Sequence, residues 1–158
     1  MTAMRIFLAV VLAVAGQQAA AIPMAWRVER ASDPAMGGRS CALVATFGAV
    51  TARLATTPGA PQPDWSVTIG FDNQPGSLRY LRVDEAIFTS ARERFEGAEA
   101  AEIVAHLKAP GEFAFEWAKR PDFAKQQGLF GTGDFAAKAA QCEDWIKGPR
   151  AARRAYVG

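Results

Sequence analysis

Short stretches of alternating apolar and polar residues follow one another over the first two thirds of the chain after residue 21. In the first of them, WRVER, apolar and charged residues alternate, which is typical of a β-strand buried on one face. Proline, glycine, asparagine and aspartate cluster between the stretches and predict turns or loops. In the fourth stretch, Trp65, Val67, Ile69 and Phe71 are expected on one face. The pattern predicts strands over residues 26–30, 40–47, 50–55, 65–71, 77–84 and 86–90.

The pattern changes to a helical one after Gly97. Residues 98–108 are rich in helix-forming side chains, and Ala100, Ile103, Val104 and Leu107 fall on a single helical stripe. An alternating, aromatic stretch over residues 112–117 predicts a further strand buried on one face, with Phe113, Phe115 and Trp117 together. The chain that follows is less regular. Residues 120–127 are expected as a loop or a short helical turn, and residues 129–130 as a brief strand.

The last regular element predicted is a helix over residues 134–147. Its apolar positions Phe135, Ala139, Cys142 and Ile146 recur on one face, so the cysteine is expected in the core. Asp134 fits the N-cap or a first-turn acid. Together these elements predict a mainly β, α+β fold, in which an antiparallel sheet or sandwich carries one internal helix and one C-terminal helix.

Residues 1–21 have the layout of a secretory signal peptide. Arg5 is followed by an unbroken apolar run over residues 6–15, and small residues precede the expected cleavage point after Ala21. The run is shorter than the roughly 20 residues that span a bilayer, so no stable membrane insertion is expected after cleavage. We therefore expect a periplasmic or secreted protein, with a single globular domain over residues 22–148 and a flexible basic tail over residues 149–158.

The two cysteines, Cys41 and Cys142, are predicted to form a disulfide in an oxidising compartment. Such a bond would close a loop on the order of 100 residues and stabilise the fold by about 4.7 kcal/mol in the chain-entropy model. The alternative is a pair of buried free thiols. Neither cysteine belongs to a CxxC motif, which argues against a thiol-exchange site.

The residue patterns of common catalytic and cofactor sites are missing from the sequence. His106 is the single histidine, and no GxSxG or HExxH motif is present. The glycine-rich stretch 128–134 continues with Asp134 and Phe135 instead of the Lys and Ser or Thr of a phosphate-binding loop, which favours a turn and a helix cap. Neighbouring acids are interleaved with basic residues and are expected on solvated faces. We therefore expect no enzyme, no bound metal and no cofactor.

The net charge of +2 is small, so a nucleic-acid partner is not expected. A mixture of aromatic, basic and proline residues over residues 117–123 has the composition of a partner-binding edge. Its candidate contact residues are Trp117, Lys119, Arg120 and Phe123, although ordinary packing of the two aromatic rings is the alternative. The basic tail is expected to aid solubility or to touch an anionic surface.

The layout of the chain resembles the invasion associated locus B family of small exported bacterial proteins. The shared features are the W-x-V strand at Trp26 and Val28, the early Cys41, the meander of strands, the helix before an aromatic strand and a closing helix that carries Cys142 and Trp145. The resemblance implies a β-rich exported fold with no recognised catalytic centre and a poorly defined molecular role. It carries over no catalytic residues.

The sequence thus favours an exported, non-enzymatic domain that binds an unidentified protein or envelope component. Two alternatives remain open. The first is a carrier of a small apolar ligand, with Phe113, Phe115 and Trp117 lining its pocket. The second is a hydrolase whose scattered carboxylates meet in a cleft.

Overall fold

The computed structural model describes residues 21–35, 37–45, 48–56, 62–121 and 124–148, and it has the predicted β-rich α+β fold. Residues 1–20, which belong to the predicted signal peptide, lie outside the described residues. The predicted tail, residues 149–158, also lies outside them. The elements are β1 (Trp26–Asp33), β2 (Gly38–Ala45), β3 (Val50–Ala55), β4 (Asp64–Ile69), β5 (Arg79–Val83), β6 (Ala86–Ser90), β7 (Phe95–Glu96), α1 (Gly97–Lys108), β8 (Glu112–Lys119), β9 (Ala124–Gly131) and α2 (Phe135–Lys147).

The first sheet is antiparallel and has the order β1-β2-β3-β4-β7. Its register places Val28 opposite Leu43, and Ala52 opposite both Leu43 and Val67, so these apolar residues share one face. The opposite face carries small and polar residues such as Glu29, Arg53, Ser66 and Thr68. This division is the physical result of the alternation in the sequence, because successive side chains of a strand point to opposite faces.

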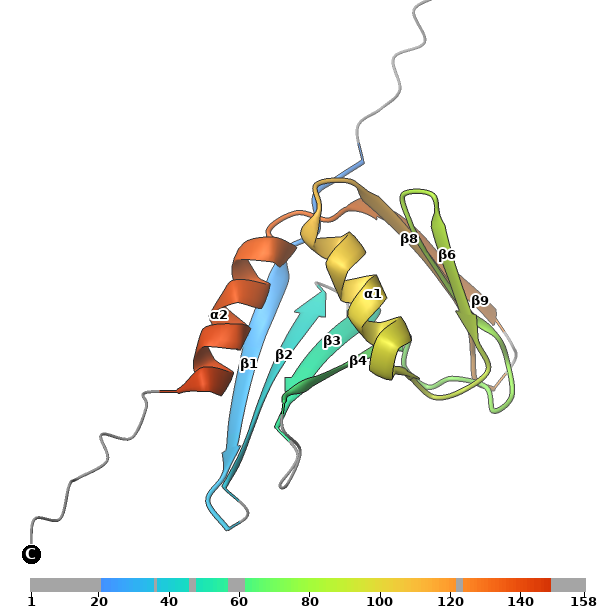
Figure 1. Ribbon diagram of the computed structural model, residues 1–158. Coiled ribbons are helices and arrows are strands. Elements are labelled where there is room, and N and C mark those ends of the chain that lie inside the picture. Colours follow the sequence, from blue (N-terminus) through green and yellow to red (C-terminus); the bar gives the residue numbers. More distant parts are fainter. Residues whose placement is uncertain (1–20, 36, 46–47, 57–61, 122–123, 149–158) are drawn as a thin grey trace, which may run out of the picture.

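The second sheet is also antiparallel and has the order β6-β5-β8-β9. Its inner face carries Leu81, Phe113, Phe115 and Trp117, and these side chains belong to the same core as the apolar face of the first sheet. Figure 1 shows the two sheets inclined to each other, with α1 between them and α2 alongside β1 and β2. The apolar stripe predicted for each helix is buried: Ala100, Ile103, Val104 and Leu107 in α1, and Phe135, Ala139, Cys142 and Ile146 in α2.

A disulfide joins Cys41 of β2 to Cys142 of α2, as the sequence predicted. The two Cα atoms are 5.4 Å apart, and 101 positions separate the residues in the chain. Both cysteines are fully buried, so the bond fastens α2 to the centre of the first sheet from within the core.

Two expectations for the segments around β8 are wrong. From Ala124 onward the chain is a strand, β9, which pairs with the whole length of β8, where a loop or a helical turn over residues 120–127 was expected. Phe71 does not continue the buried face of β4. Gly70 has φ +75° under the ring of Trp117 and turns the chain there, which leaves Phe71 47% exposed.

The start of the described chain closes one end of the molecule. The Met24 amide donates to the Gly131 carbonyl at 3.0 Å, and the Gly131 amide donates to the Ile22 carbonyl at 2.9 Å. The indole Nε1 of Trp26 donates to the Thr132 carbonyl at 2.9 Å. Residues 22–26 therefore connect the first sheet to the end of β9, and they fix where β1 begins.

Candidate binding groove

The four residues predicted to bind a partner are only partly brought together at the surface. Trp117 is 5% exposed, and its Nε1 donates to the Phe71 carbonyl at 3.2 Å, so its ring belongs to the core. Lys119 is half-buried, with its ammonium 5.1 Å from the centre of the Phe71 ring. Arg120 is exposed, and its Nε donates to the Asn73 carbonyl at 3.0 Å. Phe123 lies outside the described residues.

The aromatic residues considered for an apolar pocket are packed against one another. The ring centres of Phe113 and Phe115 are 6.1 Å apart, those of Phe115 and Trp117 are 5.7 Å apart, and Phe115 stacks on Phe130. All three residues on β8 are at most 6% exposed. The three rings considered for the alternative, an apolar-ligand carrier, therefore pack into the core.

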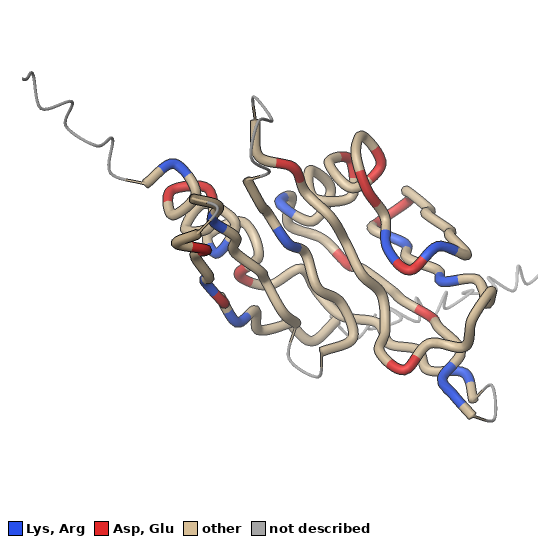
Figure 2. Tube along the Cα trace, turned by 90° about the horizontal axis from the view of Figure 1, so that it is seen from below, with Lys and Arg blue, Asp and Glu red and all other residues tan. Residues whose placement is uncertain are grey.

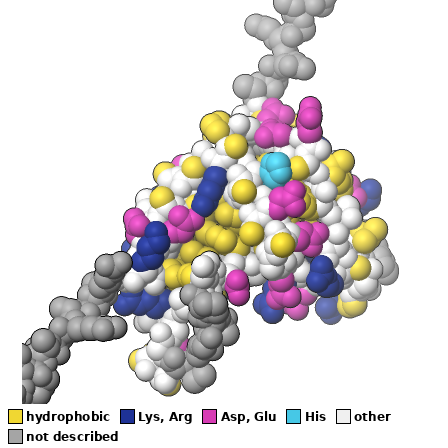
Figure 3. Space-filling model, viewed as in Figure 1, with side chains coloured by type: hydrophobic (Ala, Val, Ile, Leu, Met, Phe, Trp, Pro, Cys, Tyr) yellow, Lys and Arg dark blue, Asp and Glu magenta, His cyan; other side chains and the backbone are white. Residues whose placement is uncertain are grey.

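An apolar hollow occurs elsewhere, between α2 and strands β3 and β4, with Leu54, Trp65 and Ile146 in its lining. Figure 3 shows the hydrophobic side chains that gather at the surface beside α2. The hollow measures about 240 Å³. This volume is below the range of roughly 300–1,000 Å³ that small-molecule sites occupy in proteins.

Two of the titratable residues considered for catalysis, His106 and Glu143, each lie beside one titratable neighbour. The His106 side chain is 40% exposed, with Glu102 at 3.9 Å and the edge of Phe88 beside it. Lys108 of α1 forms an ion pair with Glu143 of α2. Among the described residues there is no group of three or more His, Cys, Asp or Glu side chains that could hold a metal ion.

Arg79 is the buried charge of the second sheet, at 5% exposure. Its Nη1 donates to the main-chain carbonyls of Ala91 and Arg92, so it anchors the segment between β6 and β7. Burial lowers the pKa of this guanidinium below its usual value, and the nearby Glu93 carboxylate partly opposes the shift. These contacts give Arg79 a structural role.

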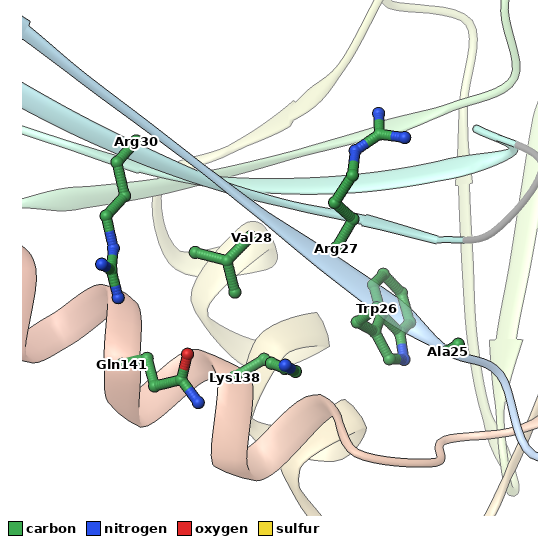
Figure 4. Close-up of a pocket in the computed structure, with 7 residues that line it drawn as sticks. All are labelled: Ala25, Trp26, Arg27, Val28, Arg30, Lys138 and Gln141. Carbon is green, nitrogen blue, oxygen red and sulfur yellow. The ribbon is translucent and has the colours of Figure 1, made fainter.

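A hollow with a combined polar and apolar lining runs between β1 and α2, and we call it the β1–α2 groove. It measures about 630 Å³ and is lined by Ala25, Trp26, Arg27, Val28, Arg30, Lys138 and Gln141. In Figure 4 the side chains of Val28 and Arg30 point from β1 toward α2, where they face Lys138 and Gln141, whereas Arg27 points away from the helix. The groove thus has one strand and one helix as its walls.

Trp26 forms the rigid end of the groove. Its ring meets that of Phe135 edge to face, with centres 4.8 Å apart, and its main-chain amide donates to Asp134 Oδ1 at 3.1 Å. Asp134 precedes α2 at the predicted N-cap position, but its side chain makes no capping hydrogen bond there. The carboxylate instead ties the beginning of β1 to the beginning of α2, which sets the spacing of the groove walls.

Trp145 of α2 lies outside the lining of the groove but contacts Arg30, which is one of the lining residues. The guanidinium of Arg30 lies 5.6 Å from the centre of the Trp145 ring, and that of Arg39 lies 5.1 Å from it. Arg39 also donates from Nη1 to the Trp145 carbonyl at 3.0 Å, which satisfies one carbonyl in the last turn of the helix. The indole ring therefore holds two arginine side chains that come from different strands.

Three cationic residues and no carboxylate belong to the lining of the groove, and two of the three, Arg30 and Lys138, lie between the strand and the helix. Arg27 is paired with Glu29 at 2.6 Å, and Lys138 lies 3.9 Å from Asp134. Arg30 is exposed and has no carboxylate partner among the described residues. The groove consequently favours a ligand that brings negative charge to Arg30.

Sequence reasoning missed this groove although its residues were visible in two patterns. The alternation of WRVER placed Trp26 and Val28 on one face, and the register adds Arg30 to that face. On α2, Asp134, Lys138, Gln141 and Trp145 follow one another at helical spacing beside the buried stripe. Neither pattern shows which flank of α2 faces β1, and the groove forms only because these two surfaces face each other.

Neither helix in the described part of the chain has the length and apolarity that crossing a bilayer requires. Comparison with known proteins gave no match to this chain among family models, curated proteins or solved structures. The resemblance to the invasion associated locus B family stays a prediction.

Proposed function

We propose that this protein is an exported, non-enzymatic domain that binds a protein or an envelope component through the β1–α2 groove. The observation that carries the proposal is the combination of an edge strand with a cationic groove along it. Strand edges are a common docking place for other chains, and natural proteins usually cover or shorten them. Here β1 has eight residues and forms the edge of its sheet.

The proposed export rests on the leader-like residues 1–21 and is compatible with the disulfide. Disulfides persist in oxidising compartments, and the Cys41–Cys142 bond is buried where it serves packing. A periplasmic or secreted location is therefore the proposed place of action.

The charge distribution supports a protein or envelope partner over a nucleic acid. Figure 2 shows Lys and Arg interspersed with Asp and Glu along the trace. A nucleic-acid interface needs a concentrated basic face, because each phosphate contact replaces condensed counterions. Arg30 and Lys138 give the groove a small, local positive charge, which is enough to select an acidic group but not to bind a nucleic acid.

The proposal is tested by affinity capture from an envelope extract with the mature protein as bait. The test variant is Arg30→Glu, which reverses the unpaired charge of the groove. The matched control is Arg53→Glu, because Arg53 is also an exposed arginine of the first sheet but lies on the opposite face. We expect the wild type and the control to retain the same partner and Arg30→Glu to lose it. Retention of that partner by Arg30→Glu would contradict the proposal.

A further inference from the structure

We propose that the ligand of the groove is an extended acidic segment of a partner protein, which adds to the first sheet as a new strand beside β1. The inference rests on the proposed function and names the chemistry of the partner. Two independent features carry it: the main-chain groups along the edge of β1 and the charge of the side chains that border it.

The hydrogen-bond pattern of β1 leaves alternate residues facing the open edge. The amide of Trp26 donates to Asp134, so the Trp26–Ala45 pair is not one of the hydrogen-bonded pairs with β2. Hydrogen-bonded and non-hydrogen-bonded pairs alternate along an antiparallel ladder. The main-chain N–H and C=O groups of Val28, Arg30 and Ser32 therefore point away from β2, to the side that the described residues leave open.

The groove gives an added strand a place for its side chains as well as for its main chain. A neighbouring strand lies roughly 4.8 Å from β1, and its alternate side chains point to the face that α2 covers. There they meet Lys138 and Gln141, next to Val28 and Arg30 (Figure 4). Main-chain pairing supplies affinity in such complexes, and the side-chain wall supplies selectivity.

Charge decides between the candidate occupants. Acidic residues facing α2 would meet Arg30 and Lys138, while the Asp134 carboxylate beside Lys138 is engaged by the Trp26 amide. A second copy paired through its own β1 would bring two cationic linings together. The chain's own C-terminal residues include Arg150, Arg153 and Arg154 and carry the same sign as the groove. An acidic segment of another protein is the occupant that the charges favour.

The first experiment measures binding of a short, fluorescently labelled peptide of alternating Thr and Glu to the mature protein. Three comparison peptides separate the contributions: Lys in place of Glu, a scrambled order of the same residues, and an N-methylated form that keeps the charges but lacks alternate main-chain donors. We expect the Thr–Glu peptide to bind. The Lys and N-methylated peptides should bind at least tenfold more weakly, because each lacks one of the two proposed interactions.

The second experiment follows amide hydrogen exchange of the protein by NMR with and without the Thr–Glu peptide. The amides of Val28, Arg30 and Ser32 should gain protection, whereas Arg27, Glu29 and Ala31 already pair with β2 and should change little. Arg30→Gln should weaken peptide binding about tenfold, and the matched control Arg53→Gln should bind as the wild type does.

Equal binding of the N-methylated peptide, or binding without protection of the three outward amides, overturns strand addition and leaves the groove as a binding site. Failure of the Thr–Glu peptide to bind at millimolar concentration overturns the acidic ligand, whatever the envelope capture shows. A dimer in light scattering, with the amides of Val28, Arg30 and Ser32 protected in the absence of peptide, assigns the edge to a second copy and also overturns the proposal. These readouts are separate from partner capture, which tests the proposed function itself.

Discussion

The two helices cover the same face of the first sheet but are held there in different ways. α1 packs between the two sheets, and its buried residues Ile103, Val104 and Leu107 are at most 2% exposed. α2 lies over β1 and β2 near the edge of the sheet and is joined to β2 by the disulfide. Because α1 is enclosed on several sides, burial holds it in place. Because α2 lies at the edge of the sheet and buries one face, it benefits from the covalent bond to β2.

The position of α2 at the edge of the sheet also leaves one of its flanks available for binding. Because the outer flank of α2 is not enclosed by a second sheet, Lys138 and Gln141 are free to form the wall of the β1–α2 groove. The disulfide and the Trp26–Asp134 hydrogen bond hold that wall in place while the flank stays accessible. The comparison therefore predicts that lesions near α2 affect the groove and lesions near α1 affect the whole fold.

The largest effect is expected when both cysteines are replaced, as Cys41→Ala with Cys142→Ala. The chain-entropy model assigns about 4.7 kcal/mol to a loop of roughly 100 residues, so the free energy of unfolding should fall by about 4–5 kcal/mol. Urea denaturation measures this change. Amide exchange should also rise more in α2 than in α1, since α2 loses its tie to β2. If amide exchange rose equally in both helices, the disulfide would not hold α2 more than it holds α1.

A smaller loss is expected from Ile103→Ala in α1. Ile103 is fully buried, and truncation of a buried isoleucine leaves a cavity that costs about 3 kcal/mol. The loss should appear as a lower urea midpoint, with amide exchange raised over both sheets. The exposed neighbour Glu102→Ala serves as the control and should change stability by no more than about 0.5 kcal/mol. If Ile103→Ala raised amide exchange in α1 alone, Ile103 would not belong to a core that α1 shares with both sheets.

The smallest of the three effects is expected from Arg39→Met. This change removes the hydrogen bond to the Trp145 carbonyl and the contact with the indole ring but keeps much of the aliphatic side chain. The expected cost is about 1–2 kcal/mol, with exchange raised in the last turn of α2. Arg27→Met is the matched control, because that arginine is 71% exposed and pairs with Glu29 on the surface. Equal losses in the two variants would show that the Arg39 contacts are not stabilising.

Most of the fold was predictable because one simple rule governs it. In β3 and β8 the alternation in the sequence matches the alternation of burial, and the apolar stripes of both helices are the faces that pack. The disulfide followed from an even cysteine count and a leader-like N-terminus. These features depend on local period and composition, which a single sequence displays directly.

The departures occur where a partner strand or a turn decides the outcome. The segment AKQQGLFG has little apolar alternation and forms β9 because β8 offers it a full edge. Gly128 has no side chain, and the Phe115 ring packs where a Cβ would stand. Phe71 was misplaced because Gly70 turns the chain before it. The groove was missed because it depends on which flank of α2 faces β1, a tertiary relation.

The contacts between residues 22–26 and the segment 131–134 have a consequence for how the molecule is made. Trp26 and Asp134 are 108 positions apart, and the cysteines are 101 apart, so both closures join the earliest described strands to the last helix. A chain emerging gradually from a ribosome or a translocation pore cannot make either closure until almost the entire domain is available. Such distant pairings slow folding relative to locally connected topologies. Assembly of the groove is therefore a late event, completed only when the last helix reaches the first strand.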